Sequence, residues 1–291
     1  MAVSRRTAWL VAIVATLTMT VSYADRLTLA VLAPSVTKAL DLSEEAYGWL
    51  GSAFAVAYLV GTPLAGWWID RAGVRRGLAV SVLAWSTVAA LHALVPGFAS
   101  LLVLRLALGL TEGPGFPGAA QTVQRILPPG DRARGFGVLF TGSSVGAMVV
   151  PPLAALIYRH AGWRVAILGT ALVGLAWIPA WLAVTRGAAV RAELAVAATP
   201  AEPPPTFAAL VRHPIVVRAL AGVAAAAPVF SFPQVWGAKY LARTFAVAQA
   251  DVGHYLWLPP LVLDAVAIAF GDLAARQRRA AGAPPRLLLA D

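Results

Sequence analysis

The sequence predicts an all-α polytopic membrane protein with about eight transmembrane helices. The 291 residues are 59% hydrophobic and only 12% charged, which is too apolar for a soluble domain of ordinary composition. Apolar runs also repeat along the whole chain with short polar breaks between them. Because one spanning helix needs roughly 20 mostly apolar residues, several spans fit, and a receptor with a single span is excluded.

The apolar runs place these helices in order. The first run follows Arg5 and Arg6 and so imitates a signal peptide, but its length and the later runs favour a first spanning helix. The other runs are separated by segments that carry glycine, proline or charged residues. The expected spans are 8–33, 47–69, 77–96, 98–120, 135–158, 163–185, 214–241 and 250–273.

The basic residues predict the orientation of the chain. If Arg5 and Arg6 are cytoplasmic, sixteen of the 23 Lys and Arg residues fall on the cytoplasmic side and five on the other side; Arg26 and Arg105 lie within spans. Cytoplasmic loops carry an excess of Lys and Arg, so both termini are expected in the cytoplasm. The net charge of +10 follows this topology and forms no continuous stripe, so no nucleic-acid partner is expected.

The longest polar break divides the chain. Residues 187–213 contain Pro200, Pro203, Pro204 and Pro205 and predict a flexible cytoplasmic linker. This division gives a six-helix half at 1–186 and a second part at 214–291, with two helices and the start of a third. Transporters are often built from matching halves, so we expect a truncated second half.

Five ionisable residues lie inside apolar runs: Asp25, Arg26, Arg105, Glu112 and Asp264. Each would cost roughly 2.5–3.5 kcal/mol at the centre of a lipid-exposed helix, so they are expected to face the bundle interior. Arg26 and Arg105 both lie ~10–12 Å below the same end of their helices, at 1.5 Å rise per residue.

Helical spacing groups these charges with one another. Arg105 and Glu112 are two turns apart and share a face, as do Tyr23 and Arg26. The two helices therefore present a polar lining in which a guanidinium can bind a carboxylate in bidentate fashion. This lining suits a small organic anion.

The intramembrane carboxylates are candidates for proton coupling. Burial and a nearby arginine act in opposite directions on the ionisation of Asp25 or Glu112, so either could change protonation as a cavity opens and closes. The alternative is that Asp25–Arg26 and Arg105–Glu112 are structural ion pairs that hold the bundle together. For Asp264, which stands alone on the eighth expected helix, structural and functional roles are equally open.

Nothing in the sequence indicates an enzyme. There is no cysteine, and His92, His160, His213 and His254 are scattered near helix ends or loops. No nucleophile–base pair or metal cluster is apparent, so we expect no catalytic residue, metal ligand or cofactor.

The segment between the second and third expected helices follows the pattern G-x-x-x-D-R-x-G-x-R-R. It resembles the signature loop of the major facilitator superfamily, and such a glycine turn with charges at a helix end suits a latch that breaks and reforms. The alternative is charge that serves topology alone. The residues of this expected gating loop are Gly66, Asp70, Arg71, Gly73, Arg75 and Arg76.

Other motifs are similar to the anion:cation symporter family within that superfamily. Residues 105–117 follow R-x-x-x-G-x-x-E with Pro114, Phe116 and Pro117 after it, and residues 23–26 follow Y-x-D-R. Gly142-Ser143-Ser144 and the segment 236–241 look most like hexuronate transporters. Glycine and proline around Glu112 also predict a broken or bendable helix.

The resemblance runs from about Ser22 to Asp272 and implies proton-driven symport of a hexuronate, aldonate or related carboxylate across a bacterial cell membrane. It implies proton-carrying roles for Asp25 and Glu112. It places a substrate-binding set around the anion: Tyr23, Arg26, Tyr58, Arg105 and Ser143. The alternatives are a non-functional fragment of such a transporter and a non-transporting membrane sensor or subunit.

Overall fold

Every element in the described part of the chain is helical. The computed structural model describes residues 3–195 and 207–266. Residues 258–266 continue as helix after the last named element. In chain order the elements are α1 (Arg5–Val31), α2 (Ala33–Ala39), α3 (Glu44–Ala72), α4 (Val74–Leu91), the 3₁₀ turn η1 (His92–Leu94), α5 (Phe98–Glu112), α6 (Gly115–Ile126), α7 (Pro129–Val184), α8 (Ala188–Ala195), α9 (Phe207–Arg212), α10 (Pro214–Val235), α11 (Gly237–Phe245) and α12 (Gly253–Leu256).

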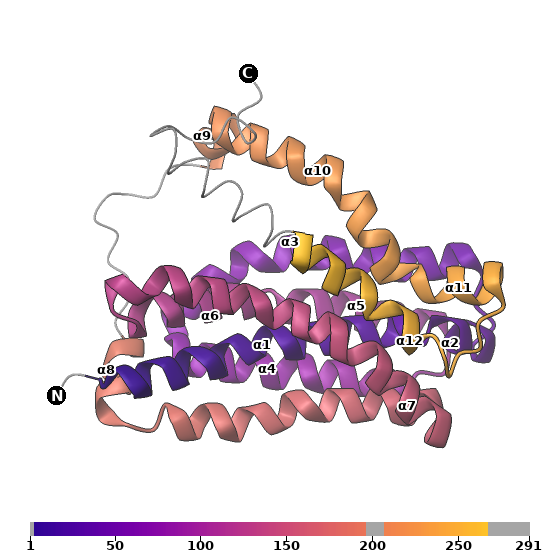
Figure 1. Cartoon of the computed structure of the whole chain (residues 1–291), viewed down its shortest axis with the longest axis horizontal. Helices are drawn as coiled ribbons and strands as arrows, with labels where there is room; N and C mark the ends of the chain where they lie inside the picture. The colour runs from indigo at the N-terminus through magenta and orange to yellow at the C-terminus, as the bar shows by residue number, and fades with distance from the viewer. Residues whose placement is uncertain (1–2, 196–206, 267–291) are drawn as a thin grey trace.

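The helices overlap the expected spans and confirm the all-helical membrane fold, but the seventh expected span, 214–241, is broken at Trp236 between α10 and α11. Among the described residues, five helices are long and apolar enough to cross a membrane: α1, α3, α4 with η1, α7 and α10. The fourth expected span is split into α5 and α6 at Gly113 and Pro114, next to Glu112, as the glycine and proline residues there predicted. α7 turns back at Gly162 (φ 79°, ψ 175°), and its two legs match the fifth and sixth expected spans (Figure 1). The last residues of the eighth expected span lie outside the described range.

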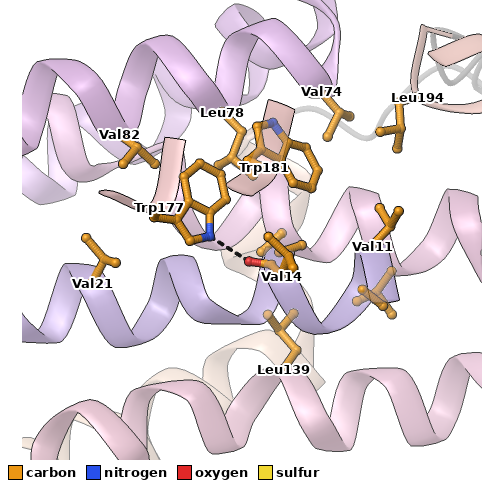
Figure 2. Packing of buried hydrophobic residues seen from close by; sticks show 14 of the residues in the cluster. Val11, Val14, Val21, Val74, Leu78, Val82, Leu139, Trp177, Trp181 and Leu194 are labelled. Carbon is orange, nitrogen blue, oxygen red and sulfur yellow. Dashed lines mark hydrogen bonds between the residues drawn. The ribbon is translucent and has the colours of Figure 1, made fainter. Parts of the chain in front are cut away.

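A hydrophobic core packs α1 against both legs of α7, and α4 packs against the second leg. Figure 2 shows Trp177 and Trp181 of α7 beside Val14 of α1 and Leu78 of α4. The indole Nε1 of Trp177 donates to the carbonyl oxygen of Val14 at 2.7 Å, and the two indole rings stack with centroids 5.4 Å apart. Because this packing sets the rotation of α1, the polar residues one to three turns further along point in defined directions.

The start of the expected linker is a packed helix. Val190 and Leu194 of α8 are buried, and Arg125 of α6 donates through Nη1 to the carbonyl oxygen of Leu194 at 3.3 Å. The proline-rich residues 200–205 lie outside the described ranges. The division of the chain into two halves stays a prediction.

Residues 214–266 contact the rest of the bundle through α12, which packs on the first leg of α7, and at the end formed by α2 and the start of α3. The Tyr47 hydroxyl donates to the carbonyl oxygen of Val235 at 2.6 Å, and Lys239 Nζ lies 2.7 Å from Glu44 Oε2. From there α10 diverges from the bundle toward α9 (Figure 1). None of the described residues of α10 is buried. The chain is therefore closed at one end and spread at the other.

Candidate functional site

A close crossing of α3 and α5 builds the first wall of the site. A Cβ at Gly109 would lie 2.5 Å from the backbone oxygen of Phe54 and 2.8 Å from the backbone nitrogen of Tyr58. Any larger residue would force the two helices apart, since both contacts are to backbone. The glycine thus lets Phe54 and Tyr58 of α3 lie directly beside α5.

Arg26 of α1 forms an ion pair with Glu112 at the end of α5. Arg26 Nη2 lies 2.9 Å from Glu112 Oε2; the glutamate side chain is fully buried, whereas that of arginine is 23% exposed. The interpretation as structural pairs Asp25–Arg26 and Arg105–Glu112 is therefore wrong in its partners. Neighbouring residues on a helix point about 100° apart, so Asp25 and Arg26 face different helices.

Aromatic rings surround the Arg26 guanidinium. Its Cζ lies 5.3 Å from the ring centroid of Tyr23 and 4.8 Å from those of both Phe54 and Tyr58. At these distances the ring faces attract a cation. Three of the expected substrate-binding residues, Tyr23, Arg26 and Tyr58, thus come together with the expected proton carrier Glu112.

Arg105 is the second cation of this cluster. It is 6% exposed, and its Cζ lies 5.8 Å from the Phe54 ring centroid, so Phe54 contacts both arginines. Within the residues that the structure describes, Arg105 forms no ion pair. Its Nε, the Nε of Arg26 and Oε1 of Glu112 are buried without a hydrogen-bond partner. With all three groups ionised, the cluster holds two positive charges and one negative charge.

Asp25 lies on another face of α1, outside this cluster. Its Oδ2 accepts a hydrogen bond from Ser86 Oγ of α4 at 3.4 Å. Asp25 also lines a cavity of about 10 Å³ together with His92, Thr28 and Thr170. The two expected proton carriers therefore have different partners, Ser86 for Asp25 and Arg26 for Glu112.

The remaining candidates lie apart from these two places. The Ser143 hydroxyl donates to the carbonyl oxygen of Phe140 in its own helix at 2.8 Å, so its substrate-binding role stays a prediction. Asp264 is half-buried in the helical stretch 258–266, and its role stays open.

The expected gating loop joins α3 to α4 at Gly73. This glycine has φ 73° and ψ 148°, which residues with a Cβ rarely adopt, and it ends one helix and begins the next. The loop is tied to two other helices. Asp70 Oδ1 accepts from Gln121 Nε2 of α6 at 3.3 Å, and Arg75 Nε donates to Thr185 Oγ1 at the end of α7 at 3.0 Å.

The other gating-loop residues make fewer contacts. Arg71 lies over the ring of Trp67, with its Cζ 4.3 Å from the centroid. Arg76 is exposed, and Gly66 lies within α3 with open space where a Cβ would be. The gating role of this loop stays a prediction.

The family model described as Major Facilitator Superfamily matches residues 12–290. The chain belongs to the major facilitator superfamily. This match confirms the resemblance to the superfamily that the signature loop indicated.

Similar superfamily members include two curated hexuronate transporters. The one from Escherichia coli (strain K12) is 29% identical over 174 residues, which are 60% of this chain and 40% of that protein. The one from Bacillus subtilis (strain 168) is 32% identical over 161 residues, 55% of this chain and 38% of that protein. The matched region thus spans about two fifths of these relatives.

A solved structure shows the same superfamily fold. The bacterial homologue of the human lysosomal transporter Spinster, in its inward-facing and unoccupied conformation, superposes with a TM-score of 0.72 at 18% sequence identity. The superposition covers 94% of this chain and 64% of that chain.

Sequence reasoning missed Phe54, Ser86 and His92. Phe54 contacts both arginines, but nothing distinguishes it from the other apolar residues of its span. Ser86 and His92 meet Asp25 only through contacts between helices. The buried charge of Asp25 was the available signal, because such a charge requires polar partners on neighbouring helices.

Proposed function

We propose that this chain works as a secondary transporter that carries a small organic anion across the cell membrane together with protons. The observation that carries the proposal is Arg105, a buried cation without a carboxylate partner among the described residues, beside the Arg26–Glu112 pair. A buried charge without a counterion is costly, and a carboxylate substrate would supply the missing negative charge. The similarity to hexuronate transporters supports the same class of substrate.

The geometry suits a hexuronate, an aldonate or a related sugar acid. A guanidinium binds a carboxylate through two parallel N–H donors, and Arg26 and Arg105 both approach Phe54. The rings of Tyr23 and Tyr58 offer apolar faces and hydroxyl groups to a sugar ring beside that carboxylate. The unpartnered Oε1 of Glu112 could accept a hydrogen bond from a sugar hydroxyl.

Glu112 provides a way to couple the proton to the anion. While ionised, Glu112 holds Arg26 through the 2.9 Å contact. When Glu112 takes up a proton, it loses its charge, and the freed Arg26 guanidinium can bind the substrate carboxylate. Proton and anion would then enter together, with Asp25 as a second proton carrier on the other face of α1.

Alternating access would use the two ends of the bundle. We assign residues 1–186 and 214–291 to two halves joined by 187–213, with both termini in the cytoplasm and the gating loop of Gly66, Asp70, Arg71, Gly73, Arg75 and Arg76 on the cytoplasmic side. The contacts of Tyr47 and Lys239 close the other end, while α10 diverges on the cytoplasmic side. This arrangement corresponds to a state that opens to the cytoplasm.

The test separates binding from transport. Purified chain is reconstituted into liposomes, and uptake of radiolabelled glucuronate, galacturonate and galactonate is measured with and without an inward proton gradient. Binding of the same anions to the detergent-purified chain is measured in parallel. We expect gradient-driven uptake of at least one anion.

The variants locate the anion site. We expect Arg105→Ala to abolish anion binding and Arg105→Lys to weaken it, because lysine cannot form the bidentate contact. Arg134→Ala is the control, since Arg134 is exposed near the start of α7 and its loss also removes one positive charge. Binding without uptake would contradict transport and favour a non-transporting role. Equal binding by Arg105→Ala and the unmodified chain would refute the anion site.

A further inference from the structure

A small polar cavity lies beside Asp25, on the face of α1 that does not carry the anion cluster. Asp25 and Thr28 of α1, His92 of η1 and Thr170 of α7 line it, all of them buried, with Leu29, Ala89 and Ile167. Its volume of about 10 Å³ is close to what one water molecule requires. A buried cavity with several polar groups holds water more readily than one lined by apolar groups alone.

Two acceptor atoms of the cavity residues lack a partner. Oδ1 of Asp25 and Nε2 of His92 are buried without a hydrogen bond within 3.5 Å, and the buried indole Nε1 of Trp85 is a donor within reach of the Asp25 carboxyl. The other imidazole nitrogen, Nδ1, lies 2.8 Å from the carbonyl oxygen of Val88. A carbonyl only accepts, so Nδ1 carries the hydrogen, and Nε2 of the neutral ring is left as an acceptor.

We infer that Asp25 and His92 bind one water molecule between them, and that His92 positions this water against the Asp25 carboxyl. A water molecule has two O–H donors, which match the two unpartnered acceptors, Oδ1 and Nε2. The inference rests on the proposed role of Asp25 as a proton carrier.

The water serves both protonation states of Asp25. With Asp25 ionised, the water donates one hydrogen to Oδ1 and the other to His92 Nε2. With Asp25 protonated, the Oδ1–H donates to the water oxygen, and the water still donates to Nε2. His92 therefore orients the water in both states and never needs to carry the proton itself.

Other charged residues near this cavity favour the neutral form of the His92 ring. Arg105 of α5 is within electrostatic reach of His92, and Glu112 of α5 is within reach of Asp25. Arg164 of α7 donates to the backbone oxygens of Ala93 and Val95 beside His92, at 2.9 and 3.3 Å. A protonated His92 would be repelled by Arg105, so the neutral ring is the form that fits.

The proposed proton site and the proposed anion site therefore lie on different faces of α1. The anion cluster uses Arg26, which faces α3 and α5, whereas the water site uses Asp25, which faces α4 and the second leg of α7. His92 lies at the end of α4 opposite the Gly73 turn, so the water site adjoins the end that the Tyr47 and Lys239 contacts close.

Infrared difference spectroscopy of the full chain in lipid nanodiscs tests the water site directly. A pH step is applied, the carboxyl C=O band of Asp25 is assigned through Asp25→Asn, and exchange into H₂¹⁸O identifies bands of bound water. We expect one isotope-sensitive water band that is lost in Asp25→Asn and in His92→Phe. In His92→Phe the Asp25 carboxyl band should move to higher wavenumber, because the carboxyl loses its hydrogen-bond partner.

Matched variants distinguish positioning from folding. His92→Gln keeps an amide acceptor and should restore both bands, while His213→Phe, at an exposed histidine, should leave both unchanged. Unchanged water and carboxyl bands in a folded His92→Phe protein would overturn the inference. If His92→Phe does not fold, the absence of any isotope-sensitive band coupled to Asp25 in the unmodified chain overturns it equally.

Transport measurements then separate this inference from the proposed function. In liposomes His92→Phe should slow proton-driven uptake and retain anion counterflow at equal pH. The spectra decide the water site whether or not the chain transports, whereas absent uptake by the unmodified chain contradicts only the proposed function.

Discussion

At the scale of single residues, the ion pair of Arg26 and Glu112 is asymmetric in its burial. Glu112 is fully enclosed, whereas 23% of the Arg26 side chain is exposed. Removing one partner of a buried pair leaves the other charge unpaired, and the cost depends on whether that charge can reach water. Removing Arg26 should therefore lower the free energy of unfolding by a different amount from removing Glu112.

We predict that Arg26→Gln destabilises the fold more than Glu112→Gln. The first change leaves an enclosed carboxylate, at a cost of about 3–5 kcal/mol. The second leaves a partly exposed guanidinium, at about 1–3 kcal/mol. The double variant should be more stable than Arg26→Gln alone. The free energy of unfolding in a detergent titration measures all three, and strictly additive losses would show that the two side chains do not interact.

At the scale of elements, the crossing of α3 and α5 decides where the aromatic residues of the cluster lie. Gly109 allows the backbones to approach, and the rings of Phe54 and Tyr58 then reach Arg26 of α1. Small residues have this role in membrane helices because close backbone contact supplies packing that lipid cannot supply. The cluster therefore depends on a residue that contributes no side chain to it.

We predict that Gly109→Ala lowers the free energy of unfolding by about 1–3 kcal/mol, the usual cost of overpacking. It should also weaken anion binding, because α3 moves away and carries Phe54 and Tyr58 with it. Gly137→Ala on α7 is the matched control, since a Cβ there meets nothing within 4 Å. Melting temperature and anion affinity are measured for both variants. Equal values for the two would mean that the crossing tolerates a methyl group.

At the scale of the whole molecule, residues 214–266 are held against the bundle at its α2 end by packing of α11 and α12 and by an ion pair between Lys239 and Glu44. Glu44 is exposed and Lys239 mostly buried, and their side chains meet at 2.7 Å. The Tyr47 ring lies 4.7 Å from Lys239 Nζ and packs edge-on against Trp236, with centroids 5.1 Å apart. Trp236 thus takes part in closing this end.

We predict that Lys239→Met opens the α2 end in a fraction of the molecules. A partly exposed ion pair contributes about 1 kcal/mol at most, so the open population should rise up to about fivefold. The chain contains no cysteine, so spin labels on Glu45→Cys and Thr244→Cys report the distance across this end without further changes.

Arg243→Met is the control for that experiment, because Arg243 is an exposed cation of the same helix. Its distance distribution should match that of the unmodified pair. A distribution for Lys239→Met that coincides with the control would show that the Glu44 contact does not hold the end closed.

The sequence by itself determined the helices and the family. Runs of about 20 apolar residues have no stable alternative to helix in lipid, since every backbone polar group must be satisfied within the segment. The break at Gly113 and Pro114 and the turn at Gly73 followed equally from local chemistry. That Asp25, Arg26, Arg105 and Glu112 face the interior also followed, because a charge in a span must avoid lipid.

Only the tertiary structure decided which of these charges meet. Helical periodicity fixes the directions of Asp25 and Arg26 relative to each other, but it says nothing about how α1 is rotated against α4 and α5. That rotation is set by packing spread over the whole bundle, such as Trp177 against Val14 and Gly109 against Phe54. It pairs Arg26 with Glu112, leaves Arg105 without an ion pair among the described residues, and places Asp25 and His92 in the lining of one cavity, because contacts between helices depend on side-chain fit and not on spacing within one helix.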